Sequence, residues 1–296
     1  MKFISKKDIK LPKRRQGSHK GDNGKVLVAG GSRDYVGAVA LAGIAALRSG
    51  ADLVNIAAPE KVAWAVNCYS PDLITTKIKG DYFKERDAKT VLNLMKKFDV
   101  LLIGNGAGLD NETKKFCKKT IKKFNGFKVV DADAIKSINT DDAENSIITP
   151  HSKELEHFLI NSSVHKTIIN KINNEKDIAK KSLIIKKTLK EFLNKNNIIL
   201  LKGKIDVIIS EDRVYYNKTG NAGMTKGGTG DVLAGLCAGF LAQSKDLVQS
   251  AVNAVYFNGL IGDILLKKKK GFSYLASDMI EEIKKVKPMN YSGGTK

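Results

Sequence analysis

The stretch Gly-Met-Thr-Lys-Gly-Gly-Thr-Gly-Asp at residues 223–231 leads directly into the apolar segment Val-Leu-Ala-Gly-Leu-Cys-Ala-Gly-Phe-Leu at residues 232–241. Closely spaced glycines let successive backbone N–H groups point at one place, and the helix predicted to follow adds the positive end of its dipole. Asp231 falls in the first turn of that helix, where the dipole favours the ionised carboxylate. The stretch therefore predicts phosphoryl transfer from a nucleotide to a hydroxyl that Asp231 deprotonates or orients.

The same residues also fit an ordinary helix-opening loop, in which Asp231 is only a capping acid. That interpretation requires no ligand. The two interpretations differ in what they expect elsewhere in the chain, because a nucleotide-dependent enzyme needs further polar residues at the ligand-facing ends of its strands.

The length of the chain fits one large α/β domain or two small ones, and one domain is the favoured interpretation. The chain has 296 residues, of which 42% are hydrophobic, enough for a substantial core. Its longest apolar runs, at residues 37–47 and 232–242, are much shorter than the ~20 residues that span a bilayer. No membrane span is expected. The N-terminus lacks the apolar stretch of a secretory signal, and the three cysteines have no metal-ligand spacing, so a reducing cytoplasm is expected.

The formal net charge of +20 raises the question of nucleic-acid binding. Only six of the 51 basic residues are arginine, and the lysines are scattered along the whole chain. Arginine is the preferred residue for bidentate recognition of phosphate and bases. The charge therefore indicates a lysine-rich surface, and no specific nucleic-acid partner is expected.

Short apolar runs alternate with helical patterns from residue 25 onward, which predicts an α/β fold with a mostly parallel sheet flanked by helices. The predicted strands are residues 25–30, 52–57, 99–104, 127–131, 146–149 and 197–202, followed by an antiparallel hairpin at residues 206–210 and 213–217. The predicted helices are residues 37–48, 231–243, 246–263 and 276–286. Residues 161–181 are polar and rich in Asn and Lys, and predict either a long exposed helix or a mobile connection. The expected layout is a basic segment at 1–20, a catalytic domain at 21–288 and a loose tail at 289–296.

Most of the predicted strands end in Gly, Asp or Thr. The carboxyl ends of parallel strands line the ligand crevice of an open α/β sheet, so polar residues there are placed for function. Asp131 and Asp133 follow one strand and could form a pair of carboxylates. Strand-end aspartates more commonly cap the next helix, and the sequence favours that role for both.

Five motifs resemble the ADP/ATP-dependent NAD(P)H-hydrate dehydratase family, the repair enzymes of the ribokinase-like superfamily. They occur in the family's order and cover nearly the whole chain, from about Leu11 to about Glu282. The motifs are His-Lys-Gly-Asp (19–22), Gly-Gly-Ser-Arg-Asp-Tyr-Val-Gly-Ala (30–38), Ile-Gly-Asn-Gly-Ala-Gly (103–108), Asp-Ala-Asp (131–133) with Thr-Pro-His-Ser-Lys-Glu (149–154), and Gly-Asn-Ala-Gly-Met (220–224) with Gly-Gly-Thr-Gly-Asp-Val-Leu-Ala-Gly (227–235).

The resemblance implies a three-layer ribokinase-like fold and a dehydratase that restores NADH or NADPH from the S epimer of its hydrate, using ADP or ATP and releasing phosphate. It implies that Asp231 is the catalytic base and a substrate contact. The residues implied for the substrate are Ala38, Gly106, Gly108 and His151, and those implied for the nucleotide are Lys202, Gly203, Lys204, Ile205, Asp206, Gly228, Thr229 and Gly230. Mg²⁺ is expected on the phosphates, with Glu154 reaching it through water.

Three departures from the family pattern stand out. Ser152 and Lys153 replace a common Pro-Gly, Asp206 stands where many relatives have Thr, and Lys226 adds a cation beside the glycine-rich turn. The epimerase domain that is fused to this one in some relatives is absent, so a separate epimerase is expected as functional partner. A symmetric homo-oligomer is also expected.

Two other functions fit parts of the sequence. A ribokinase-like kinase for a vitamin-precursor alcohol, of the hydroxymethylpyrimidine or hydroxyethylthiazole type, would share the glycine-rich turn and Asp231. Such kinases do not combine the motif at 30–38 with Thr-Pro-His at 149–151. A binding protein without turnover, which senses adenine nucleotide, would show nucleotide affinity alone.

Overall fold

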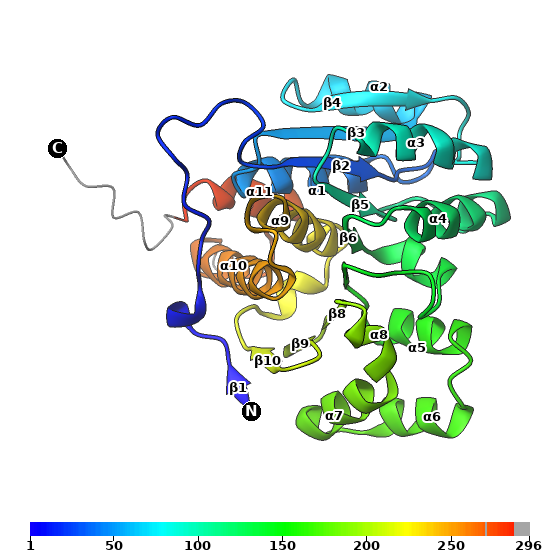
Figure 1. The fold of residues 1–296 in the computed structure, drawn as a ribbon. Coiled ribbons are helices and arrows are strands. Elements are labelled where there is room, and N and C mark those ends of the chain that lie inside the picture. Colours follow the sequence, from blue (N-terminus) through cyan, green and yellow to red (C-terminus); the bar gives the residue numbers. More distant parts are fainter. Residues whose placement is uncertain (270, 287–296) are drawn as a thin grey trace.

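The computed structural model describes residues 1–269 and 271–286, and within them ten strands form one sheet in the order β1-β10-β9-β8-β7-β6-β5-β2-β3-β4 (Figure 1). The strands are β1 (Lys2–Phe3), β2 (Lys25–Ala29), β3 (Leu53–Pro59), β4 (Ile74–Ile78), β5 (Val100–Ile103), β6 (Phe127–Val130), β7 (Ser146–Ile148), β8 (Ile198–Leu201), β9 (Asp206–Ile209) and β10 (Val214–Asn217). The seven neighbours from β4 to β8 pair in parallel, whereas β9 is antiparallel to both β8 and β10. The predicted parallel sheet and hairpin are confirmed.

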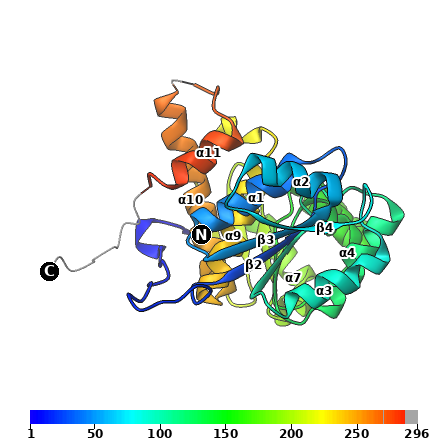
Figure 2. The same ribbon diagram turned by 90° about the horizontal axis from the view of Figure 1, so that it is seen from above.

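Helices cover both faces of the sheet. They are α1 (Gly37–Arg48), α2 (Glu60–Tyr69), α3 (Ala88–Met95), α4 (Asn111–Lys123), α5 (Ser152–Asn161), α6 (Lys166–Asn174), α7 (Ile178–Thr188), α8 (Lys190–Asn194), α9 (Thr229–Ser244), α10 (Leu247–Lys268) and α11 (Ala276–Ile283), with the short 3-10 helices η1 (Lys6–Asp8), η2 (Glu85–Asp87), η3 (Ala132–Ser137) and η4 (Ala222–Thr225). Seen from above, α1, α2 and α11 lie on one face, while α3 and α4 lie on the other (Figure 2). This arrangement is the predicted three-layer architecture.

Two apolar cores lie on opposite faces of the sheet. Along β2, Val26 and Val28 join the core beneath α1, α9 and α10, while Leu27 and Ala29 join the core beneath α3 and α4. Side chains alternate between the faces of a strand, so a strand covered on both faces reads as a continuous apolar run. This is why β2 could be located from the sequence alone.

Residues 161–181 differ from the prediction, which was a long exposed helix or a mobile connection. They contain α6 and the start of α7, and both helices pack on the domain through the buried side chains of Ile169, Ile172 and Ile185. The Asp177 carboxylate accepts hydrogen bonds from the backbone N–H groups of residues 179 and 180 and starts the second helix. The prediction was wrong because a few widely spaced isoleucines are enough to bury one face of each helix.

The sequence predicted a basic segment at residues 1–20 and a loose tail at residues 289–296. In the structure, β1 pairs in parallel with β10, and the buried Ile4 and Ile9 join the core, so residues 1–20 contribute to the sheet edge. The predicted tail at 289–296 lies outside the described residues. Within the described part of the chain, no helix combines the length and apolarity needed to cross a bilayer.

Candidate active site

The site lies where the carboxyl ends of β5, β6, β7 and β8 meet the N-terminus of α9. A polar side chain follows each strand, directly for Asp131, Thr149 and Lys202 and one residue later, after Gly104, for Asn105. Parallel pairing brings the four strand ends to one edge of the sheet. Asp231 enters from α9, whose N-terminus approaches the same edge.

The glycine-rich turn before α9 has a backbone that only glycine adopts without strain. Gly228 is the N-cap of α9 with φ of 91°. A Cβ atom at this position would lie 2.7 Å from Cδ1 of Leu41 and 2.9 Å from Cβ of Ala276. The turn is therefore fixed both by its backbone conformation and by close contact with α1 and α11.

Two side chains of the glycine-rich turn, those of Thr229 and Lys226, donate hydrogen bonds to backbone carbonyl oxygens. The hydroxyl of Thr229 donates hydrogen bonds to the carbonyl oxygens of Met224, at 2.7 Å, and Lys226, at 3.0 Å. The ammonium of Lys226 donates to the carbonyl oxygens of Phe272 and Tyr274. Lys226 therefore ties the turn to the segment between α10 and α11, a contact that the sequence did not predict.

The Asp231 carboxylate is held by Asn105. The amide nitrogen Nδ2 of Asn105 donates to Oδ1 of Asp231 at 2.7 Å and to Oδ2 of Asp131 at 2.9 Å. Oδ1 of Asp131 in turn accepts from the Thr149 hydroxyl at 2.6 Å and from the Lys202 ammonium at 2.9 Å. Five side chains from five elements thus form one hydrogen-bonded network.

This environment changes the acidity of Asp231. Burial, followed by the nearby negative charge of Asp131, raises the pKa of Asp231 to about 7, while the hydrogen bond from Asn105 and the Lys202 cation oppose the shift. Burial lowers the pKa of Lys202, but Asp131 and Glu154 outweigh it and the net pKa is raised. A carboxyl group with a pKa near neutrality is well matched to accept a proton from a hydroxyl.

His151 and Glu154 form a reciprocal cap at the start of α5. Nδ1 of His151 accepts from the backbone N–H of Lys153 at 3.2 Å, and Oε2 of Glu154 accepts from the backbone N–H of His151 at 2.9 Å. Partial burial lowers the pKa of His151, assisted by the Lys202 cation and opposed by Glu154. The His151 side chain remains half exposed beside the strand ends.

The structure brings Ala38 and Gly106 together. Gly106 has φ of 61°, and a Cβ there would lie 2.8 Å from Cβ of Tyr35 and 3.0 Å from Cβ of Ala38. The hydroxyl of Ser32 donates to the carbonyl oxygen of Gly106 at 2.8 Å. Two segments that are far apart in the sequence therefore form one backbone surface beside the network.

Gly108 and the second strand-end carboxylate, Asp133, are also neighbours. The backbone N–H of Gly108 donates to Oδ2 of Asp133 at 3.0 Å, and Oδ1 of Asp133 accepts from Lys136. Asp131 was expected to cap the following helix, but its side chain makes no capping hydrogen bond to η3. That expectation was wrong, because its two oxygens are already occupied by Asn105, Thr149 and Lys202.

Of the strand-end residues predicted for the nucleotide, Lys202 lies next to the start of α9. Lys202 points into the acidic network, and a Cβ at Gly230 would lie 3.7 Å from its Nζ. The backbone N–H of Gly203 donates to Oδ1 of Asp206, and burial raises the pKa of Asp206 to about 6. Ile205 is half-buried, whereas Lys204 is exposed.

Sequence reasoning did not identify Asn105 and Thr149 as functional, and it assigned Asp131 to helix capping. Asn105 was visible only as the variable position of a Gly-x-Gly-x-Gly strand end. Asn105 and Asp131 follow two adjacent strands, and this shared position could have indicated that Asn105 is functional. The parallel pairing of β5 with β6 was needed to see the contact between Asn105 and Asp131.

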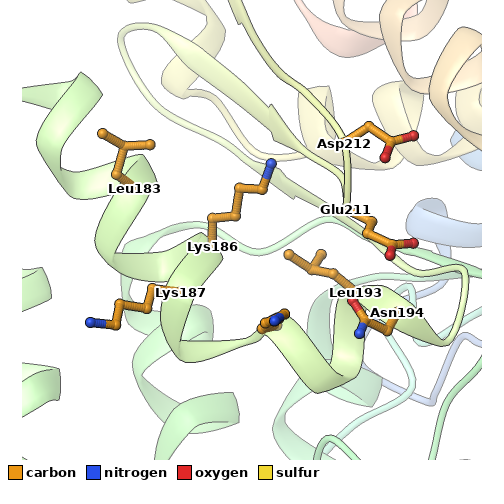
Figure 3. Close-up of a pocket in the computed structure, with 8 residues that line it drawn as sticks. Leu183, Lys186, Lys187, Leu193, Asn194, Glu211 and Asp212 are labelled. Atoms are coloured by element: carbon orange, nitrogen blue, oxygen red, sulfur yellow. The ribbon is translucent and has the colours of Figure 1, made fainter.

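A separate pocket of about 420 Å³ lies among α7, α8 and the turn between β9 and β10 (Figure 3). It is lined by Leu183, Lys186, Lys187, Lys190, Leu193, Asn194, Glu211 and Asp212. None of the predicted site residues, all of which the structure describes, is among them. The pocket is therefore distinct from the site at the strand ends.

Comparison with known proteins places this geometry in a family. Residues 26–285 match the family model described as NAD(P)H-hydrate dehydratase. The chain is 42% identical to a bifunctional NAD(P)H-hydrate repair enzyme of Methanocaldococcus jannaschii over 94% of this chain and 51% of that protein. It is 32% identical to an ADP-dependent (S)-NAD(P)H-hydrate dehydratase of Cenarchaeum symbiosum, over 95% of this chain and 94% of that protein.

A solved structure gives the same result. The ADP/ATP-dependent NAD(P)H-hydrate dehydratase of Bacillus subtilis, co-crystallized with ATP and Mg²⁺, superposes with a TM-score of 0.75 at 26% identity, covering 96% of this chain and 98% of that one. The chain spans about half the length of several curated relatives that it matches, including the M. jannaschii protein. The match over residues 26–285 includes every element of the site, and the chain belongs to the NAD(P)H-hydrate dehydratase family, with a ribokinase-like fold.

Proposed function

We propose that this chain dehydrates the S epimer of hydrated NADH or NADPH at the expense of ADP or ATP and releases phosphate. The observation that carries the proposal is the Asp231 carboxylate, desolvated at the N-terminus of α9 and directly preceded by the glycine-rich turn. A base and an anion site lie side by side there, as phosphoryl transfer to a hydroxyl requires. The names of the relatives supply the substrate class.

In the proposed mechanism, Asp231 accepts the proton of the nicotinamide-ring hydroxyl as that oxygen forms a bond to the terminal phosphorus. The bond between this phosphorus and the nucleotide oxygen breaks, and the shorter nucleotide leaves. The backbone N–H groups of residues 228–230 stabilise charge on the transferring phosphoryl group. The bond between the ring carbon and the phosphate oxygen then breaks, and a proton leaves the neighbouring ring carbon, so that phosphate is released and the ring double bond of the reduced cofactor is restored.

The remaining predicted residues take positions consistent with binding roles. We assign the substrate to the surface formed by Ala38, Gly106 and His151, with Gly108 at its border. The nucleotide is assigned to residues 202–206 together with Gly228, Thr229 and Gly230. Gly106 and Gly203 lie just after β5 and β8, and Gly228 and Gly230 lie at the start of α9; the lack of a Cβ at these positions lets a ligand approach the backbone closely.

Mg²⁺ is expected with the nucleotide. Within residues 1–269 and 271–286, no three His, Cys, Asp or Glu side chains are grouped to hold a metal ion. Both oxygens of Glu154 already face donors of His151 and Lys202. Such a donor set fits an ion that takes most of its ligands from phosphate and water, as Mg²⁺ usually does, with Glu154 reached through water. When bound, the ion offsets charge on the phosphates.

We further propose a cytoplasmic location, a homo-oligomeric state and cooperation with a separate epimerase. The location rests on the three cysteines, which are all free thiols in the described part of the chain, as suits a reducing compartment. The oligomer rests on the general prevalence of symmetric assemblies. The epimerase follows from the substrate, because a dehydratase for one epimer acts on the whole pool only when the other is converted.

The test is recovery of reduced-nicotinamide absorbance when purified protein is incubated with hydrated NADH, Mg²⁺ and either ADP or ATP. Asp231→Asn should lose on the order of 10²–10⁴-fold in turnover while retaining nucleotide binding, since only the base is removed. Asp142→Asn removes a buried carboxylate that pairs with Lys118 outside the site, and should leave turnover per folded molecule unchanged. Phosphorylation of a vitamin-precursor alcohol without any dehydration would instead identify a kinase, and nucleotide binding without turnover would identify a sensor.

A further inference from the structure

Asn105 lies between two carboxylates and bonds to both through a single nitrogen. Its Nδ2 lies 2.7 Å from Oδ1 of Asp231 and 2.9 Å from Oδ2 of Asp131. The side chain is fully buried. An amide NH₂ has two donor hydrogens, so this geometry uses its entire donor capacity.

The backbone around Asn105 is rigidly placed. The backbone N–H of Gly31 donates to the carbonyl oxygen of Asn105 at 2.8 Å, and a Cβ at Gly30 would lie 2.5 Å from the same oxygen. Gly104 and Gly106, on either side, have φ of 116° and 61°. A Cβ at Gly104 would also lie 2.1 Å from the carbonyl oxygen of Asp131. The Asn105 side chain is thus directed at the two carboxylates by contacts that exclude larger residues.

The orientation of the Asn105 amide is set by its neighbours. Its Oδ1 is buried and has no hydrogen-bond partner within the described part of the chain. A flipped amide would place this oxygen against both Asp131 and Asp231, where negative charges would repel it. An unpaired buried acceptor destabilises the folded state, a cost that an apolar side chain of similar size would avoid. The donor pair is therefore the property that this position supplies.

Three charged groups act on Asp231, and a fourth contacts one of them. Asp131 follows β6, Asp133 lies in η3 and Lys202 follows β8, while Glu154 of α5 reaches Asp231 only through Lys202. Asp131 and Asp133 raise the pKa of Asp231 in addition to burial, whereas Asn105 and Lys202 lower it. Asn105 and Asp131 thus act on the same carboxylate in opposite directions.

We propose that Asn105 and Asp131 are positioning residues for the Asp231 base. Asp131 keeps the Asn105 NH₂ directed toward Asp231, and Asn105 holds Oδ1 of Asp231 so that Oδ2 is left for the substrate hydroxyl. The role of this hydroxyl rests on the proposed function, whereas the control of Asp231 by its two neighbours does not.

The test is a titration of the Asp231 carboxyl by carbon NMR on selectively labelled protein, with Asp231→Asn to assign the resonance. Asn105→Leu removes the donor and should move the Asp231 midpoint to higher pH. Asp131→Ala removes a negative charge and frees Lys202 to pair with Asp231, so the midpoint should move to lower pH. Because leucine could disturb the packing, Asn105→Ala is measured as well, and the same upward movement is expected.

A matched control distinguishes positioning from general destabilisation. Asn253 is also fully buried, but it bonds to the backbone of Lys10 and lies outside the site. Asn253→Leu should lower the thermal midpoint without moving the Asp231 titration. Shifts of the same sign in the Asn105 and Asp131 variants, or no shift in either, would overturn the proposal.

Kinetics provide the second readout. The acidic limb of the kcat/KM profile should move with the NMR midpoint in each variant. In Asn105→Leu, kcat should fall on the order of 10- to 100-fold while KM for the nucleotide changes little, because the base is displaced but the nucleotide segment is intact. Opposite NMR shifts in a protein without dehydratase activity would refute the proposed function and leave the positioning role standing. Dehydratase activity in a protein whose Asp231 midpoint does not move in the variants would refute the positioning role and leave the proposed function standing.

Discussion

The ammonium group of Lys202 lies 2.9 Å from Oδ1 of Asp131, and both side chains are largely withdrawn from solvent. The same ammonium is 3.6 Å from Oε2 of Glu154. A cation predicted to contact the nucleotide is thus also the counter-ion of an acidic cluster. Its removal would leave buried carboxylates without a positive partner.

Lys202→Met should therefore destabilise the protein by about 3–5 kcal/mol, since breaking a buried pair leaves an uncompensated charge. Nucleotide affinity should also fall, by tenfold or more. Urea unfolding and nucleotide titration measure the two effects. Lys195→Met removes an exposed ion pair with Asp141 and should cost less than about 1 kcal/mol. Equal losses of stability in the two variants would contradict the buried-cluster interpretation.

Gly228→Ala and Gly227→Ala form a matched pair of adjacent substitutions. A Cβ at Gly228 would meet Leu41 and Ala276 below 3 Å at a positive φ, whereas nothing lies within 4 Å of a Cβ at Gly227. We expect Gly228→Ala to cost about 1–3 kcal/mol and to reduce turnover, because the N–H groups of the turn must shift. Gly227→Ala should change stability by less than about 0.5 kcal/mol. Thermal unfolding of both variants decides the point, and similar midpoints would refute it.

Asp231→Asn should change how stability depends on pH. The Asp231 carboxyl has an ordinary pKa of 3.8 when unfolded and about 7 in the folded protein. Between these values the folded state binds more protons than the unfolded state, so this group's contribution is fully present below pH 3.8 and is lost as pH rises through 7. Asparagine does not titrate, and the variant should therefore gain stability relative to the unmodified protein as the pH rises towards neutrality, by about 1.4 kcal/mol for each unit of the pKa difference.

Urea unfolding at pH 5 and pH 8 checks this prediction, since ~pH 5 keeps Asp231 protonated and ~pH 8 ionises it. At the lower pH only part of the difference has developed, so the advantage of the variant should be smaller there than at the higher pH. A stability difference that is the same at both values would show that Asp231 is not the titrating group.

Several elements could be predicted because their patterns are local. The helix at residues 37–48 was predicted with the bounds that the structure shows, and the strands before it and after it were found from their apolar runs. The edge strand β4 was missed, because its Ile-Thr-Thr-Lys-Ile sequence has a half-polar pattern typical of a strand with one uncovered side. A local sequence pattern predicts a strand or helix only where the element is buried enough to consist largely of apolar residues.

The sequence by itself determined most of the strands, the family and the place of Asp231 at the start of a helix, because each depends on short runs of residues that are neighbours in the chain. Only the tertiary structure decided that Asn105 bridges Asp231 and Asp131, that Lys202 is their counter-ion, and that Lys226 bonds to the segment before α11. These contacts join residues up to 126 positions apart. They arise because parallel pairing gathers separate strand ends at one edge of the sheet, and spacing along the chain does not encode which polar side chains meet there.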